Sequence, residues 1–311
     1  MDFLIIPLLV LGIGLTFIGG DDDSDDDSDA SEPISNESDD TRIALPGTDG
    51  GDMLDAIRAS RIFAGDGDDT VNGSDEDDLV AAGVGNDLVL ASGGDDEVNG
   101  SIGRDTLEGG NGDDTITGGF GDDDLFGDAG DDALSGGFGN DFLFGDIGND
   151  VLEGEDGNDT LVSFLGSDTL SGGADDDLLD ALDLPLFTGP DAPDVLDGGD
   201  GNDTLLGDDG DILTGGDGID EFDVVVGPGS EPVVVTDFDL AQESVELVIF
   251  LSADLQAMGP SGVTVTDAPN GSDLLFLLNT PDGLQSPILV FEGLAGTPGS
   301  AINGSLNVLT L

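Results

Sequence analysis

The chain has 311 residues, of which 71 are acidic and only four are basic, so its net charge at pH 7 is -67. This charge excludes nucleic acid as a partner, because phosphates would be repelled and no basic stripe is present to release counterions. The chain has no Cys, His, Trp or Tyr, which excludes disulfides and the transition-metal sites built on thiolate or imidazole. The remaining ligands are oxygen atoms, which suit hard cations and calcium above all.

The chain begins with an uncharged stretch at residues 3–20, "FLIIPLLVLGIGLTFIGG". Its length is at the lower limit for a helix that spans a bilayer. No Lys or Arg flanks it, and only Gly19 and Gly20 offer small residues for cleavage. We interpret residues 1–20 as an apolar membrane anchor, with a cleaved signal segment as the alternative.

An acidic linker is expected at residues 21–46. Its first twenty residues, 21–40, are an Asp- and Ser-rich run with almost no apolar side chains. Such a run buries too little surface to offset the entropy of the chain, so we expect a disordered, self-repelling spacer.

A nine-residue repeat fills the middle of the chain. Thirteen units follow without a gap from Ala64 to Asp180, each with Asp in sixth place and an aliphatic residue in eighth place. After an insertion at 181–188 the pattern resumes at Gly189, and the unit at Gly207 is one residue short. A single matching unit lies upstream at 47–55, separated from the array by the degenerate residues 56–63. The sixth-place residues are Asp52, Asp69, Asp78, Asp87, Asp96, Asp105, Asp114, Asp123, Asp132, Asp141, Asp150, Asp159, Asp168, Asp177, Asp194, Asp203, Asp211 and Asp220.

Each place in the unit has a physical role. Glycines in the first, second and fourth places permit positive φ and close backbone approach, which predicts a tight turn over the first six residues. The last three residues favour a short strand whose eighth-place side chain faces a narrow core. Low-complexity acidic disorder would not fix the aliphatic residues in one place, so the pattern favours stacked, ordered repeats.

These units resemble the nonapeptide G-G-x-G-x-D-x-U-x of RTX, or haemolysin-type, calcium-binding proteins. The resemblance implies an all-β fold: a parallel β-roll with two units per coil and Ca²⁺ ions between units i and i+2. It implies that the sixth-place aspartates are the side-chain ligands, while the glycines in the first and fourth places contribute conformation and carbonyl oxygens. It also implies at most about eleven ions in the contiguous array. It also implies folding driven by calcium.

Some units depart from the pattern. Ala64, Ala82, Ala91 and Ser163 replace the first glycine and Phe164 fills a second place, so the N-terminal edge and the neighbourhood of Asp168 differ from the other units. The insertion at 181–188 should interrupt the roll or bulge from it.

Residues 224–311 lose the repeat and become apolar. About five strands are expected, around "PVVVTDFD", "VELVIF", "GVTVT", "DLLFLLN" and "ILVFEGL", with hairpin turns at "APNGSD" and "TPDGLQS". We expect a β-rich cap on the roll at 47–223. The segment "VTDFD" resembles the one that follows the roll in many RTX proteins, and the acidic tail ending in "NVLTL" resembles C-terminal signals for type I secretion.

We therefore expect an exported or cell-surface calcium-binding protein of a Gram-negative bacterium with a structural or interaction role, tethered if residues 3–20 stay in the membrane. An adhesin whose C-terminal region binds a ligand is the alternative. We expect no enzyme, because the chain lacks the His, Cys and Lys that proteolytic, esterolytic and Schiff-base sites need. A carboxylate-pair hydrolase remains chemically conceivable, although the sequence has no non-repeat domain of enzymatic size.

Overall fold

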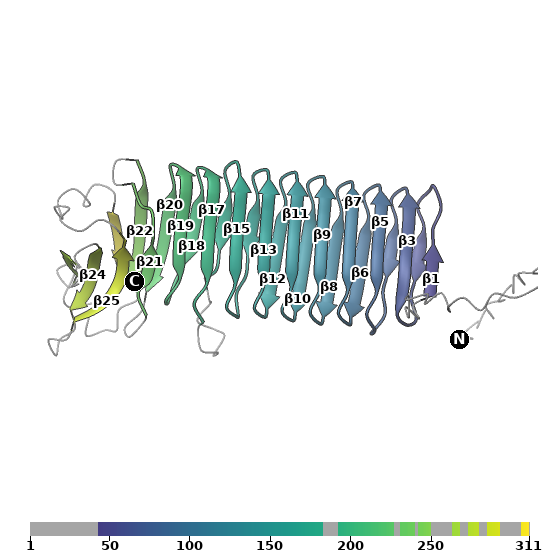
Figure 1. The fold of residues 1–311 in the computed structure, drawn as a ribbon, viewed down its shortest axis with the longest axis horizontal. Coiled ribbons are helices and arrows are strands. Elements are labelled where there is room, and N and C mark those ends of the chain that lie inside the picture. The colour runs from purple at the N-terminus through teal and green to yellow at the C-terminus, as the bar shows by residue number, and fades with distance from the viewer. Residues whose placement is uncertain are drawn as a thin grey trace, which may run out of the picture. The chain divides into compact units, whose positions relative to one another are not determined.

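The computed structural model describes residues 43–182, 192–226, 231–239, 242–249, 263–267, 273–279, 285–292 and 306–310. Every regular element in these ranges is a β-strand, arranged in two facing sheets (Figure 1). The expected all-β fold, a parallel roll of stacked coils, is confirmed. The N-terminal segment at 1–20 and residues 21–42 of the expected linker lie outside the described residues.

The strands alternate between the two sheets along the chain. In order across the first sheet they are β1 (Ile43–Pro46), β3 (Ser60–Asp66), β5 (Leu79–Val84), β7 (Glu97–Ile102), β9 (Thr115–Phe120), β11 (Ala133–Phe138), β13 (Val151–Asp156), β15 (Thr169–Ala174), β17 (Val195–Gly201), β19 (Ile212–Gly218), β21 (Val233–Val235), β25 (Gln285–Phe291), β24 (Leu274–Asn279) and β23 (Val263–Asp267). In order across the second sheet they are β2 (Met53–Asp55), β4 (Thr70–Asn72), β6 (Leu88–Gly93), β8 (Thr106–Asn111), β10 (Asp124–Ala129), β12 (Phe142–Ile147), β14 (Thr160–Val162), β16 (Leu178–Asp180), β18 (Thr204–Gly207), β20 (Glu221–Val226), β22 (Ser244–Ile249) and β26 (Leu306–Thr310).

Two repeat units make one coil, so parallel neighbours are 18 residues apart in the regular array. Leu143 of β12, for example, pairs with Leu125 of β10. A typical strand such as β9 covers the last three places of one unit and the first three of the next. The expectation of a turn over the first six places is therefore wrong in extent: the turn occupies only the fourth to sixth places. The cause is that the second- and third-place residues still pair in the parallel ladder.

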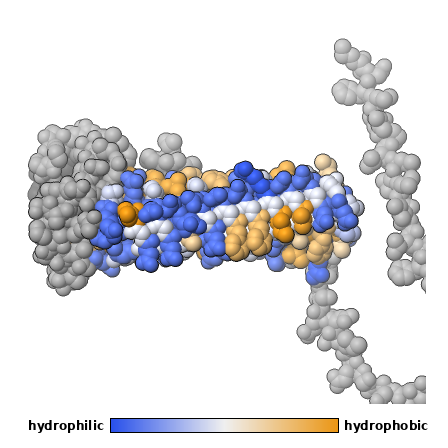
Figure 2. All heavy atoms as spheres, turned by 90° about the horizontal axis from the view of Figure 1, so that it is seen from above, coloured by the Kyte–Doolittle hydropathy of each residue, from blue (hydrophilic) through white to orange (hydrophobic). Residues whose placement is uncertain are grey.

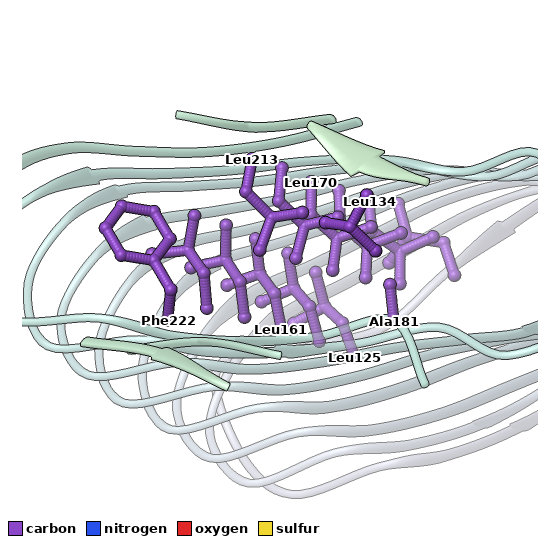
Figure 3. Close-up of a cluster of buried hydrophobic side chains, with 14 of the residues drawn as sticks. Leu125, Leu134, Leu161, Leu170, Ala181, Leu213 and Phe222 are labelled. Atoms are coloured by element: carbon purple, nitrogen blue, oxygen red, sulfur yellow. The ribbon is translucent and has the colours of Figure 1, made fainter. Parts of the chain in front are cut away.

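The core is a double row of eighth-place side chains between the two sheets. These residues are almost fully buried, with Leu125, Leu143, Leu161 and Leu170 at 0% exposure. Figure 3 shows the row from one sheet, with Leu134, Leu170 and Leu213, facing the row from the other, with Leu125, Leu161 and Phe222. Burial alternates along each strand, so the first-place residue also faces inward, beside the turn that carries the aspartate.

The array is more continuous than the sequence suggests. The degenerate residues 56–63 contribute most of β3, which pairs with β1 and β5 and places Ile62 in the core. Across the insertion, β15 pairs with β17 and β16 with β18, with Thr169 opposite Val195. Pairing therefore continues past the insertion, and the register offset grows from 18 to 26 residues. Residues 183–191 of this region lie outside the described part of the chain.

Beyond the repeats, the strands β21 and β22 extend the two sheets, and β23, β24 and β25 form an antiparallel set on the first sheet. This set matches the two hairpins expected from the sequence, while the residues of their turns are outside the described ranges. Phe222, Phe238, Phe276 and Phe291 contact one another with ring centroids 4.7 to 5.9 Å apart. These aromatic rings continue the aliphatic core into the C-terminal region. One further strand, β26, which the sequence pattern did not predict, lies in the C-terminal tail and pairs with β22.

In the part of the chain that the structure describes, no helix is long and apolar enough to cross a membrane.

Truncation of one core residue tests the thin core. We expect Leu143→Ala, which empties a fully buried eighth place, to lower the free energy of unfolding of the calcium-saturated protein by about 2–5 kcal/mol. Ile147→Ala is the matched control, because Ile147 in the same strand is 49% exposed, and we expect a change within about 0.5 kcal/mol. Denaturant unfolding would measure both, and equal effects of the two variants would contradict the core assignment.

Candidate calcium-binding turns

The sixth-place aspartates form two rows, one along each edge where the chain turns between the sheets. All of them are buried at 0–4% exposure except Asp52, which is half-buried. In each row the backbone N–H of one aspartate donates to the Oδ1 of the aspartate in the next coil, as Asp105 N–H does to Asp123 at 2.7 Å. The first row is Asp52, Asp69, Asp87, Asp105, Asp123, Asp141, Asp159, Asp177, Asp203 and Asp220. The second row is Asp78, Asp96, Asp114, Asp132, Asp150, Asp168, Asp194 and Asp211.

The second carboxylate oxygen, Oδ2, has no such partner in most of these turns. It is buried without a hydrogen bond in Asp69, Asp87, Asp96, Asp105, Asp114, Asp123, Asp132, Asp141, Asp159, Asp168, Asp177, Asp203 and Asp220. Buried carboxylate oxygens are costly unless a donor or a cation compensates them. A divalent cation beside each of these unpartnered, negatively charged oxygen atoms would compensate them.

The first-place glycine makes room beside this oxygen. At Gly100 an added Cβ would lie 2.5 Å from Asp105 Oδ2 and 2.8 Å from the Gly118 carbonyl oxygen one coil later. The parallel ladder skips this place: Thr117 pairs with Ser135 and Gly119 with Gly137, but Gly118 has no ladder partner. A carboxylate oxygen and a main-chain carbonyl oxygen thus border one inward-facing space that the glycine leaves open.

Positive φ occurs in the second and fourth places and not in the first. Gly119 and Gly121 have φ of 111° and 146°, and even Asp128 in a second place has φ of 70°. The expected role of the first glycine is therefore corrected: it provides close approach to the carboxylate, while the other two provide the backbone bend. Ala64, Ala82 and Ala91 occupy the same first place and are fully buried.

Burial shifts the acidity of these carboxyls. It raises the pKa of Asp96, Asp105, Asp132, Asp141, Asp150 and Asp177 from the usual 3.8 to about 7. It raises the pKa of Asp114, Asp159 and Asp203 to about 6. The backbone N–H bond from the preceding coil acts in the opposite direction, and neighbouring carboxylates add to the rise. A bound cation would reverse this shift by favouring the ionised form.

Four turns differ because the protein itself supplies a donor to Oδ2. Asp52 accepts from the Thr48 backbone N–H at 2.6 Å, and Asp78 accepts from the Ser74 backbone N–H at 2.8 Å. Asp211 accepts from the Asp208 backbone N–H at 2.7 Å. Asp150 accepts from the hydroxyl of Ser163 at 3.3 Å. The eighteen aspartates are therefore alike in sequence position but not in their surroundings.

Two residues in the same rows were not found from the sequence. Ser60 precedes Asp78 in the second row and donates its N–H to Asp78 Oδ1 at 2.5 Å. Glu243 follows Asp220 in the first row, because Ser244 pairs with Glu221, and it is 6% exposed. The signal for Glu243 was the short pattern "ESVE", in which an acid precedes a strand with an apolar residue two places later. It lacked the glycines that marked the other units.

No group of three acidic side chains converges on one point among the residues described here. Any cation held in these turns would therefore take only one or two carboxylates and complete its shell with main-chain carbonyl oxygens. Such a mixed oxygen shell is usual for calcium.

The raised pKa values predict an unusual pH dependence of the calcium-free protein. A carboxyl whose pKa is higher in the folded state binds protons more tightly there, so stability increases as the pH falls from about 7 toward about 4. We expect chelator-treated protein to have more β-structure at about pH 5.5 than at about pH 8, measured by far-UV circular dichroism. Equal structure at both pH values would contradict the prediction, and calcium-saturated protein serves as the control.

Comparison with known families agrees with this geometry. The sequence model of the RTX calcium-binding nonapeptide repeat matches residues 59–89, 90–125, 99–134, 126–161, 165–183 and 191–222. No curated protein matches the chain. The matched ranges cover the stacked coils that carry the buried aspartates, and they include part of the degenerate segment at 56–63. The chain therefore belongs, through its array at residues 59–222, to the family of RTX calcium-binding nonapeptide-repeat proteins.

Proposed function

We propose that the protein is an exported or cell-surface β-roll that folds when several Ca²⁺ ions bind between its stacked turns. The observation that carries this proposal is the repeated buried Oδ2 atom that has no partner in the protein. The family supports calcium as the ion. The sequence has no Cys or His, so oxygen atoms are the available ligands, and this favours a cation that prefers oxygen.

The ligands we propose are the sixth-place aspartates together with main-chain carbonyls of neighbouring coils. Asp105 and Gly118 illustrate the arrangement, since their oxygen atoms border the same space. Calcium takes six to eight oxygen ligands in flexible geometry, so mixed shells along each row suit it better than magnesium. When bound, the ion would supply the positive charge that the buried carboxylates need. The protein contributes the alignment of successive coils through the N–H to Oδ1 bonds.

The domain organisation we propose has an anchor or signal segment at 1–20, a linker at 21–46, the roll at 47–223 and a β-rich cap at 224–311. The strand β1 pairs with β3, so residues 43–46 of the linker range belong to the sheet. The aromatic cluster around Phe238 supports the cap, because it covers the end of the core row with apolar surface.

Calcium-dependent folding suits export. At the low calcium of a cytoplasm the buried carboxylates would repel one another and the roll would stay unfolded, whereas calcium outside the cell would fold it. Proteins with RTX repeats are typically extracellular. We infer export with the C-terminal region as a type I secretion signal, and retention at the surface if residues 3–20 remain in a membrane.

An interaction role is favoured by one feature of the outer surface. Val84, Ile102, Phe120 and Phe138 are opposite one another in successive coils of the first sheet, and each is 46–56% exposed. The rings of Phe120 and Phe138 stack with centroids 4.9 Å apart. Figure 2 shows hydrophobic side chains gathered in part of an otherwise mostly hydrophilic face. This row supports a structural or adhesive role.

RTX repeat arrays are typically non-catalytic, and we propose no enzymatic activity.

A calcium titration tests the proposed folding. We expect chelator-treated protein lacking residues 1–20 to change from coil to β-structure at about millimolar Ca²⁺ or below, while equal Mg²⁺ has little effect. Far-UV circular dichroism at about pH 8 would measure the change. If the spectrum stays that of a coil up to millimolar calcium, the proposed calcium-driven folding must be withdrawn.

A pair of adjacent substitutions tests the ligand assignment. Asp123→Asn keeps the Oδ1 acceptor but replaces the buried, unpartnered Oδ2 by an amide, so we expect the loss of at least one bound Ca²⁺ per chain. Asp122→Asn is the matched control, because Asp122 is exposed and accepts hydrogen bonds from Asn140. Native mass spectrometry would count the ions. Equal counts for the two variants would exclude Asp123 as a ligand.

A further inference from the structure

We propose that the array contains open turns, which take calcium, and closed turns, in which a donor of the protein occupies the place of the ion at Oδ2. The proposal rests on the calcium-binding function proposed above and refines it. Open turns have an unpartnered Oδ2, as at Asp123. Closed turns are those of Asp52, Asp78, Asp150 and Asp211.

The closed turn at Asp150 depends on one side chain. Ser163 is fully buried and stands in a first place, where its neighbours in the regular array have glycine. Its hydroxyl donates to Asp150 Oδ2 at 3.3 Å. The same hydroxyl oxygen lies 2.6 Å from the point where a Cβ on Gly145 would lie, so it fills the space that the open turns keep beside the carboxylate.

The strand that precedes Ser163 is also irregular. The strand β14 ends at Val162, three residues shorter than its regular neighbour β12, and only an isolated bridge between Ile147 and Leu165 follows. Asp168, in the same unit as Ser163, has an Oδ2 atom without a hydrogen bond, so the hydroxyl of Ser163 closes the turn of Asp150 alone.

The other closed turns use backbone donors and lie toward the ends of the array. At Asp52 and Asp78 the donor is the N–H four residues earlier, and the Thr48 and Ser74 hydroxyls add a second contact at 2.9 and 3.1 Å. Glu243, the last acid in its row, accepts the N–H four residues earlier, that of Asp239, at 2.6 Å. Asp211 belongs to the unit that is one residue short.

This placement has a physical consequence. At the ends of the array a coil adjoins one that lacks the regular unit, as the coil of Asp78 adjoins that of Ser60, so an ion there would have fewer regular-turn oxygens on one side. Intramolecular donors keep the terminal carboxylates compensated without calcium. The ends of the roll would then be ordered independently of the ion, and Ser163 would divide the row between them into two calcium-binding stretches.

The decisive variant is Ser163→Gly, which restores the regular first place. We expect it to bind at least one more Ca²⁺ per chain than the unmodified protein. Native mass spectrometry of the full chain at saturating calcium would count the ions. Ser171→Gly is the matched control, since Ser171 lies in the ninth place of the same unit on the outer side of β15, and we expect its count to equal that of the unmodified protein.

A second variant keeps the proposal testable if Ser163→Gly does not fold. Asp150→Asn retains an Oδ1 acceptor and places an amide against Ser163, so at a closed turn we expect no change in the number of ions. The loss of an ion in Asp150→Asn, or an unchanged count in folded Ser163→Gly, would overturn the proposal of closed turns. The absence of any bound calcium in the unmodified protein would instead overturn the proposed function.

Discussion

The whole stack depends on one carboxylate per turn and on the different partners of its two oxygens. Oδ1 accepts the N–H of the corresponding aspartate in the preceding coil, which aligns the backbone of the two coils. Oδ2 faces inward beside the first-place residue, which is glycine in most units, and most of these Oδ2 atoms have no protein partner. The alignment that holds the coils together therefore also buries negative charge. The calcium that we propose for these turns would resolve this conflict, because it would compensate the charge without removing the hydrogen bond.

The narrow core explains why the charge matters so much. Each nine-residue unit contributes one large apolar side chain to the interior, and the inward-facing first place is usually glycine. A glycine-rich chain loses much conformational entropy when it becomes ordered. Burial of one aliphatic side chain per unit offsets only part of that loss, which is why we propose that ion binding contributes folding free energy. The raised pKa of Asp105 and Asp132 reports the same cost from the electrostatic side.

The sequence predicts most of this arrangement because its pattern is strict. The eighth-place residues and the sixth-place aspartates recur at a fixed spacing, and a parallel stack is the structure in which that spacing places them in rows. The sequence does not predict where hydrogen-bond donors fall between coils. Ser163 replaces a first-place glycine, and its hydroxyl donates to the aspartate of a different unit. Ser74 follows a first-place glycine, and it donates mainly through its N–H to the aspartate of its own unit. Ser60 and Glu243 were missed for a related reason: their neighbours lack glycines, and only strand pairing reveals their place in the rows.

The irregular coils show which feature fixes the register. Across the insertion, the backbone N–H groups of Asp168 and Asp177 donate to Oδ1 atoms 26 residues further along the chain, at 2.7 and 2.8 Å. At the short unit, Asp194 and Asp203 do the same over 17 residues, at 2.9 and 3.0 Å. Coil length changes by up to nine residues between these cases, while the contact between successive aspartates is retained. Because each coil contacts only its neighbours, extra residues can leave the stack at the end of a strand without disturbing the next turn. The carboxylate-to-backbone bond, rather than the nine-residue spacing itself, is therefore what the fold preserves.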